Sequence, residues 1–211
     1  MSVDPWPASP QSGEVVIYRR VSPVRPEPEP VSPNDRFPQS VLDLPHTTTV
    51  YATFGTVFAD AGVLRTMIHA VQDLDVNLVV TTGHGVDPNS LGVAAGARGC
   101  SAIPPAVPAA AKMQRGRVAR RFRNGVGALA QRLPQVCVPV GADQFVNAER
   151  IARYGAGIVL SPDARTPQAV RAALLSVLQD PSFASAATRL QSEVERMPPA
   201  DALLSTLLAG K

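Results

Sequence analysis

The chain has 211 residues, 45% of them hydrophobic, which is enough for the core of one domain and argues against a disordered protein. It has no apolar run near the roughly 18–20 residues that span a bilayer, no secretory signal at its N-terminus, and only two cysteines. These features exclude an integral membrane protein and a disulfide-rich scaffold, and we expect a cytoplasmic protein with unpaired thiols.

The positive charge is concentrated in one segment. The whole chain carries 20 Lys and Arg against 17 Asp and Glu, a formal net charge of +3. Between Pro88 and Ala142 there are eight basic residues and no acidic one, so the rest of the chain is acidic. A basic stretch of this kind is one feature of proteins that bind polyanions.

Residues 1–45 contain ten of the 21 prolines. Proline fixes φ and removes a backbone donor, so this stretch is predicted to be an extended linker or remnant, with at most a short strand at 15–18.

From residue 46 to 211, apolar strands and amphipathic helices alternate, typical of one α/β domain. Strands are predicted at 49–54, 76–81, 135–139 and 157–160, and helices at 63–74, 144–154, 166–178, 180–196 and 200–208. Two of the helices start with a capping residue followed by proline, Thr166-Pro167 and Asp180-Pro181. The pattern predicts a Rossmann-like parallel sheet with flanking helices, binding ligands at the carboxyl ends of its strands.

Residues 93–126 do not fit this alternation. Residues 93–111 are rich in Ala, Pro and Gly, and residues 114–124 are rich in Arg, without a helix or strand period. A doubly wound domain needs a strand, a turn and a helix at this place in the chain. If the segment is translated as printed, we expect the central sheet to lose a strand and the protein to fold marginally.

Two stretches resemble the C-terminal, donor-binding domain of GT-B glycosyltransferases. The first, residues 50–58, is similar to the strand and Gly-Thr turn that open that domain. The second runs from 133 to 139 and continues into Gly141-Ala142-Asp143-Gln144 and Asn147-Ala148, similar to the Pro-rich strand and Asp-Gln helix start of the branch that glycosylates macrolides and other natural products. This branch belongs to the UDP-glycosyltransferase superfamily. The resemblance covers residues 24–92 and 127–205.

The resemblance implies that the chain binds a nucleotide-diphosphate sugar within an enzyme that transfers a hexose to a hydroxyl of a small lipophilic acceptor, with no metal or cofactor. Asp143 and Gln144 are implied to hydrogen-bond the donor sugar, since a carboxylate and an amide can recognise a polyol; an isolated Asp here is otherwise an N-cap. In GT-B enzymes the reaction takes place in a cleft between two Rossmann-like domains. Gly55 and Thr56 are implied to lie at the other side of this cleft from Asp143 and Gln144, or else to form a simple strand-ending turn.

The chain departs from the family in its middle. It lacks the Tyr-x-Pro-Gln segment that packs on the nucleobase in relatives, and the His-Gly-Gly-x-Gly-Thr loop that binds the diphosphate. Back-translating residues 103–125 one base downstream permits both motifs, the second at residues 119–124. We therefore predict two compensating one-base shifts, near Gly92 and near Val126.

Residues 1–45 also cannot be the acceptor-binding domain, which carries the catalytic base in relatives. His46, His69 and His84 are better explained as surface or loop histidines, so no catalytic residue is assigned. We expect a truncated chain that is inactive alone. Two alternatives stay open: a partner that docks on a separately encoded acceptor-binding domain, and a non-catalytic polyanion- or RNA-binding protein that uses the Arg-rich segment. Nucleic-acid binding is the less favoured, because Phe122 is the only aromatic residue among the arginines.

Overall fold

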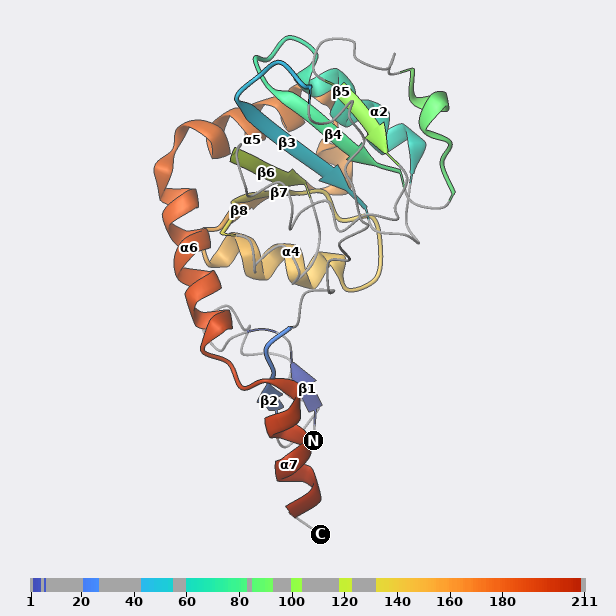
Figure 1. The fold of residues 1–211 in the computed structure, drawn as a ribbon. Coiled ribbons are helices and arrows are strands. Elements are labelled where there is room, and N and C mark those ends of the chain that lie inside the picture. The colour runs from blue at the N-terminus through green and yellow to red at the C-terminus, as the bar shows by residue number, and fades with distance from the viewer. Residues whose placement is uncertain are drawn as a thin grey trace.

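The computed structural model (Figure 1) describes residues 2–4, 6, 21–26, 43–54, 60–82, 85–92, 100–103, 118–122 and 132–209. The strands are β1 (Ser2–Asp4), β2 (Val21–Pro23), β3 (Thr48–Thr53), β4 (Asn77–Thr81), β5 (Cys100–Ile103), β6 (Val118–Phe122), β7 (Gln135–Cys137) and β8 (Gly157–Val159). The α-helices are α2 (Ala61–Val71), α4 (Gln144–Arg153), α5 (Pro167–Gln179), α6 (Pro181–Glu195) and α7 (Ala200–Ala209). Short 3-10 helices are η1 (Pro88–Leu91) and η5 (Pro162–Ala164).

Six parallel strands form the main sheet, in the order β5-β4-β3-β6-β7-β8. The chain builds outward from β3 to β4 and β5, then crosses to β6 and builds outward through β7 and β8 on the other side. The strand order therefore reverses between β3 and β6. Open α/β sheets bind ligands at the carboxyl ends of the strands beside such a reversal, so the predicted Rossmann-like architecture is confirmed.

The helices cover the sheet on two faces (Figure 1). Residues of α2 and α5 form one core cluster with alternate residues of β3 and β4, whereas residues of α4 and α6 form a second cluster at β7. The alternation of side chains along a strand divides β7 between these cores, with Val136 in the first and Cys137 in the second. α4, which follows β7, packs on this second core through Ala148 and Ile151.

The expectation that the sheet would lose a strand is wrong. β6 pairs with β3 on one side and with β7 on the other, and β5 pairs with β4. Strand pairing uses backbone N–H and C=O groups, which Val118–Phe122 supplies although two of its residues are arginines. The prediction failed because it relied on an apolar side-chain pattern that this segment lacks.

The predicted helix starts are confirmed by their capping contacts. The Thr166 Oγ1 atom accepts the backbone N–H of Ala169 at 3.2 Å, and Asp180 Oδ1 accepts that of Ser182 at 2.8 Å. The short strand considered at 15–18 lies outside the described residues. Among the helices of the described ranges, none is long and apolar enough to cross a membrane.

The N-terminal residues contact the domain more closely than a linker would. β1 and β2 pair in parallel, and the backbone N–H of Arg25 donates to the carbonyl of Pro198 at 2.8 Å. Trp6 is 1% exposed and belongs to the core cluster of α4 and α6. Part of residues 1–45 therefore packs on the α/β domain.

Candidate functional site

The loop from β7 to α4 lies at the carboxyl edge of the sheet. The arrowheads of β3 and β4 point toward the side on which α4 begins (Figure 1). Arg165, in the loop after β8, donates through Nη2 to the carbonyl oxygen of Pro139 and so links two neighbouring loops of this edge. Ala142 has a φ of 53°, in the left-handed region that costs a residue with a side chain about 1–2 kcal/mol. Such strain is often found at functional sites.

Asp143 occupies the N-cap position of α4 but does not cap the helix with its side chain. Its φ and ψ of −71° and −6° are already helical, and its exposed carboxylate accepts a hydrogen bond from Asn147 Nδ2 at 2.7 Å instead. Asp60, by contrast, does cap its helix, because its Oδ1 accepts the backbone N–H groups of Gly62 and Val63 at the start of α2. The explanation of Asp143 as a simple N-cap therefore lacks its defining hydrogen bond.

Gln144 is 8% exposed and points back under the loop that precedes it. Its Oε1 atom accepts the backbone N–H of Val140 at 2.7 Å and that of Gly141 at 3.3 Å. One side chain thus fixes the loop that leads to Asp143. The two residues predicted to contact a sugar lie next to each other, one exposed and one buried.

Asn147 and Trp6 connect Asp143 to the core, and no pattern in the sequence indicated Trp6 as part of the site. The indole Nε1–H of Trp6 donates to Asn147 Oδ1 at 2.9 Å, in a buried contact between residues 141 positions apart. The guanidinium carbon of Arg150 lies 5.5 Å from the centre of the Trp6 ring, a cation–π contact. The signal in the sequence was the single tryptophan of the chain, a large apolar side chain in a stretch otherwise predicted as linker.

Gly55 and Thr56, predicted to lie across the cleft, fall outside the described residues, as does His84. The two described histidines lie at the opposite, amino edge of the sheet. The backbone N–H of His46 donates to Asn77 Oδ1 at 2.9 Å just before β3, and His69 is exposed in the last turn of α2, which leads to β4. Neither lies near Asp143, in keeping with the surface or loop roles predicted for them.

The chemistry that this edge offers is hydrogen bonding. An exposed carboxylate can accept from hydroxyl groups, and residues beside it at the start of a helix can present further donors. In the part of the chain that the structure describes, no three His, Cys, Asp or Glu side chains gather to hold a metal ion. Independence from metals and cofactors stays a prediction.

The nearest thiol is not part of this site. Cys137 is fully buried and outside any disulfide, and burial raises its pKa to about 12. Such a thiol is a poor nucleophile at neutral pH.

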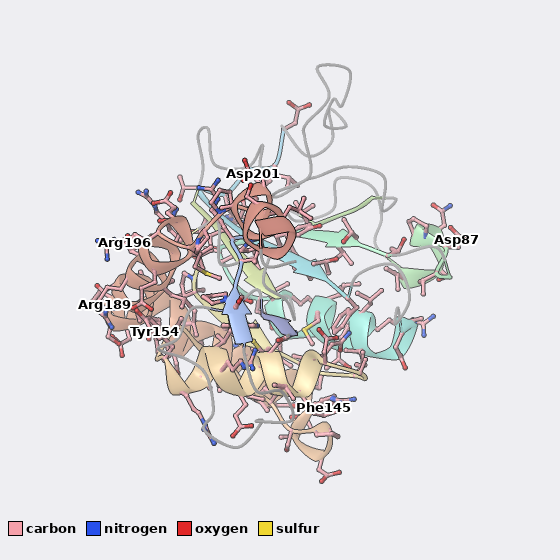
Figure 2. The ribbon with its side chains drawn as sticks, turned by 90° about the horizontal axis from the view of Figure 1, so that it is seen from below. Asp87, Phe145, Tyr154, Arg189, Arg196 and Asp201 are labelled. Atoms are coloured by element: carbon pink, nitrogen blue, oxygen red, sulfur yellow. The ribbon has the colours of Figure 1, made fainter. Side chains whose placement is uncertain are left out.

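On the other side of α4, Phe145 and Val146 are 43% and 44% exposed, and Phe145 lies on the outer surface in Figure 2.

A family model described as "Erythromycin biosynthesis protein CIII-like, C-terminal domain" matches residues 65–209. The 10-deoxymethynolide desosaminyltransferase of Streptomyces venezuelae is 46% identical over 66 residues, which cover 31% of this chain and 16% of that protein. A PGL/p-HBAD biosynthesis glycosyltransferase of Mycobacterium tuberculosis (strain ATCC 25618 / H37Rv) is 31% identical over 147 residues, 67% of this chain and 32% of that protein.

A solved structure supports the same similarity. The spinosyn rhamnosyltransferase SpnG, complexed with thymidine diphosphate, superimposes with a TM-score of 0.75 at 26% identity, covering 97% of this chain and 55% of that one. The chain therefore spans about half the length of this solved relative. The segments that match the two curated relatives cover 16% and 32% of the length of those proteins.

Proposed function

The chain belongs to the family of erythromycin biosynthesis protein CIII-like C-terminal domains, the donor-binding half of GT-B natural-product glycosyltransferases, and we propose that it binds a nucleoside-diphosphate sugar at the carboxyl edge of its sheet. Asp143 and Gln144 contact the sugar hydroxyls in this proposal. The observation that carries it is the Asp143 carboxylate, which is exposed, makes no capping bond and is oriented by Asn147. A carboxylate held in this way is suited to recognising a polyol.

Thymidine diphosphate is the nucleotide that we propose for the donor. The support is the solved relative that contains it, which is 26% identical over nearly the whole chain. The reaction proposed for the complete enzyme is transfer of a hexose to a hydroxyl of a small lipophilic acceptor, by direct displacement at the anomeric carbon. The nucleoside diphosphate leaves as a base takes the proton of the acceptor hydroxyl.

Assayed alone, the chain is expected to bind the donor without transferring the sugar. The described histidines, His46 and His69, lie at the amino edge of the sheet, away from Asp143. None of the described residues is therefore assigned as the base. A separately encoded acceptor-binding domain stays a proposed partner.

The polyanion-binding alternative depends on the Arg-rich segment, of which the structure describes the backbone of β6. The backbone of Arg120 and Arg121 lies in β6, between β3 and β7, in the middle of the sheet. The rest of the Arg-rich segment lies outside the described residues, so polyanion binding stays an untested alternative.

Calorimetric titration of the full chain with dTDP-glucose and with dTDP tests the proposal. We expect wild-type protein to bind dTDP-glucose more tightly than dTDP. In Asp143→Asn, we expect the ratio of the dissociation constants of dTDP and dTDP-glucose to fall roughly tenfold, while the affinity for dTDP stays unchanged. Asp180→Asn is the control, because it changes the same functional group at the start of α6, on the opposite edge of the sheet. Equal affinities of the wild-type protein for both nucleotides would contradict the proposal.

A further inference from the structure

Trp6 reaches the candidate site through one intermediate residue. It is buried against α4 and α6, and its only polar atom, Nε1, donates to Asn147 Oδ1 at 2.9 Å. Asn147, which is 7% exposed, donates in turn through Nδ2 to Asp143 Oδ2 at 2.7 Å. A continuous chain of hydrogen bonds therefore joins an N-terminal residue to the exposed carboxylate.

The direction of these hydrogen bonds is fixed by chemistry. An indole N–H can only donate, so it holds the oxygen of the Asn147 amide toward Trp6. The amide nitrogen must then face Asp143, where it donates to the carboxylate. Arg150 lies over the Trp6 ring at 5.5 Å and adds a second contact between Trp6 and α4. Trp6 thus selects the one orientation of Asn147 that can hold the carboxylate.

We propose that Trp6 and Asn147 are positioning residues for Asp143, and that they set how strongly the site prefers a sugar nucleotide over the bare nucleoside diphosphate. The inference rests on the proposed function, since it concerns the same carboxylate. Neither residue touches the sugar. They act by holding one carboxylate oxygen, so that the other is presented to a hydroxyl group in a fixed direction.

Two substitutions break this chain of hydrogen bonds at different places. Trp6→Phe keeps an aromatic ring in the core but removes the N–H donor to Asn147. Asn147→Asp keeps the size of the side chain and an acceptor for Trp6, but places a carboxylate oxygen against Asp143 in place of the N–H donor. The matched control is Tyr154→Phe, which removes the 2.6 Å hydrogen bond from Tyr154 to Glu193 at the far end of α4, about 15 Å along the helix.

The readout is the ratio of the dissociation constants of dTDP and dTDP-glucose, measured by calorimetry on the full chain. We expect this ratio to fall roughly threefold in Trp6→Phe and roughly tenfold in Asn147→Asp, and to stay at the wild-type value in Tyr154→Phe. A residue with only a structural role would weaken both ligands in parallel. Parallel weakening, or an unchanged ratio in both variants, would overturn the inference.

Asp143→Asn separates this inference from the function on which it rests. If that variant loses the sugar preference while Trp6→Phe and Asn147→Asp keep it, the sugar site stands and the positioning role fails. If the wild-type protein shows no preference, the sugar site fails and the positioning role with it. The single tryptophan gives a second readout, because we expect dTDP-glucose to change Trp6 fluorescence more than dTDP does; equal changes would count against the coupling.

Discussion

The Oε1 atom of Gln144 accepts the backbone N–H of Val140 at 2.7 Å. The residue expected to contact a sugar therefore also closes the loop between β7 and α4, four residues back along the chain. In this protein the geometry of the candidate site and the stability of the strand–helix junction depend on the same side chain.

Substitutions of Gln144 should separate these two roles. Gln144→Leu leaves the N–H of Val140 without its partner, and we expect the free energy of unfolding to fall by about 1–2 kcal/mol. Gln144→Glu keeps an acceptor oxygen for that N–H but loses the amide donor, so we expect near-wild-type stability with a weaker preference for dTDP-glucose over dTDP. Urea unfolding and calorimetry measure the two effects. Equal destabilisation by both substitutions would show that Oε1 does not hold the loop.

Gly157 is required by close packing of β8 against β7. A Cβ atom at this position would overlap the backbone carbonyl oxygen of Gln135 and lie 2.9 Å from Cγ2 of Ile151. We expect Gly157→Ala to lower the free energy of unfolding by about 3 kcal/mol, because neither neighbour can move without shifting the sheet or α4. Gly85→Ala is the control, since nothing lies within 4 Å of a Cβ there. Similar stabilities of both variants in urea would refute this account.

Stability should fall in alkaline solution. Burial raises the pKa of Cys137 to about 12 from an ordinary value of 9.0, so above pH 9 the unfolded chain loses a proton that the folded protein keeps. Each pH unit between these values then removes up to about 1.4 kcal/mol of unfolding free energy. Burial and the hydrogen bond to Glu193 raise the pKa of Tyr154 too, which acts in the same direction.

Chemical denaturation between pH 8 and pH 11 measures this dependence. We expect Cys137→Ala to be less stable than wild-type protein at pH 8, because of the cavity, but to lose less stability as the pH rises. In the double variant with Cys137→Ala, Tyr154→Phe should further reduce the slope of the free energy of unfolding against pH. A slope unchanged by Cys137→Ala would mean that the thiol does not titrate differently in the folded and unfolded states.

The two arginines of β6 favour the prediction that the middle of the gene is shifted in frame. A strand with parallel neighbours on both sides is covered on both faces and usually reads as an apolar run. Val118–Phe122 contains two consecutive arginines at this place. Resequencing the DNA across codons 92–126 is expected to find two compensating one-base shifts and a His-Gly-Gly-Ser-Gly-Thr loop. If the reading frame one base downstream does not encode these motifs, the prediction is wrong.

Local signals made much of the fold predictable. Thr166 and Asp180, each followed by proline, predicted two helix starts that their capping bonds confirm. The strand predicted at 135–139 and the helix predicted at 144–154, which Gly155 ends, are present as Gln135–Cys137 and Gln144–Arg153. These signals lie within a few residues of the structure they determine.

Long-range contacts were not predictable in this way. Trp6 contacts Asn147 across 141 positions, and no local pattern indicates that a tryptophan among prolines packs on a distant helix. β6 was missed for a related reason, since its place depends on backbone pairing with β3 and β7 and not on its own side chains. The pair Asp143 and Gln144 could be proposed from sequence, but the orientation of the carboxylate by Asn147 required the structure.

The most direct test of the sugar site is an NMR titration of the isotope-labelled chain with dTDP-glucose and, separately, with dTDP. We expect the amide signals of residues 140–147 to move in the presence of the sugar nucleotide and to move much less with dTDP. Sugar-dependent shifts confined to other parts of the chain, or identical shifts with both nucleotides, would contradict it.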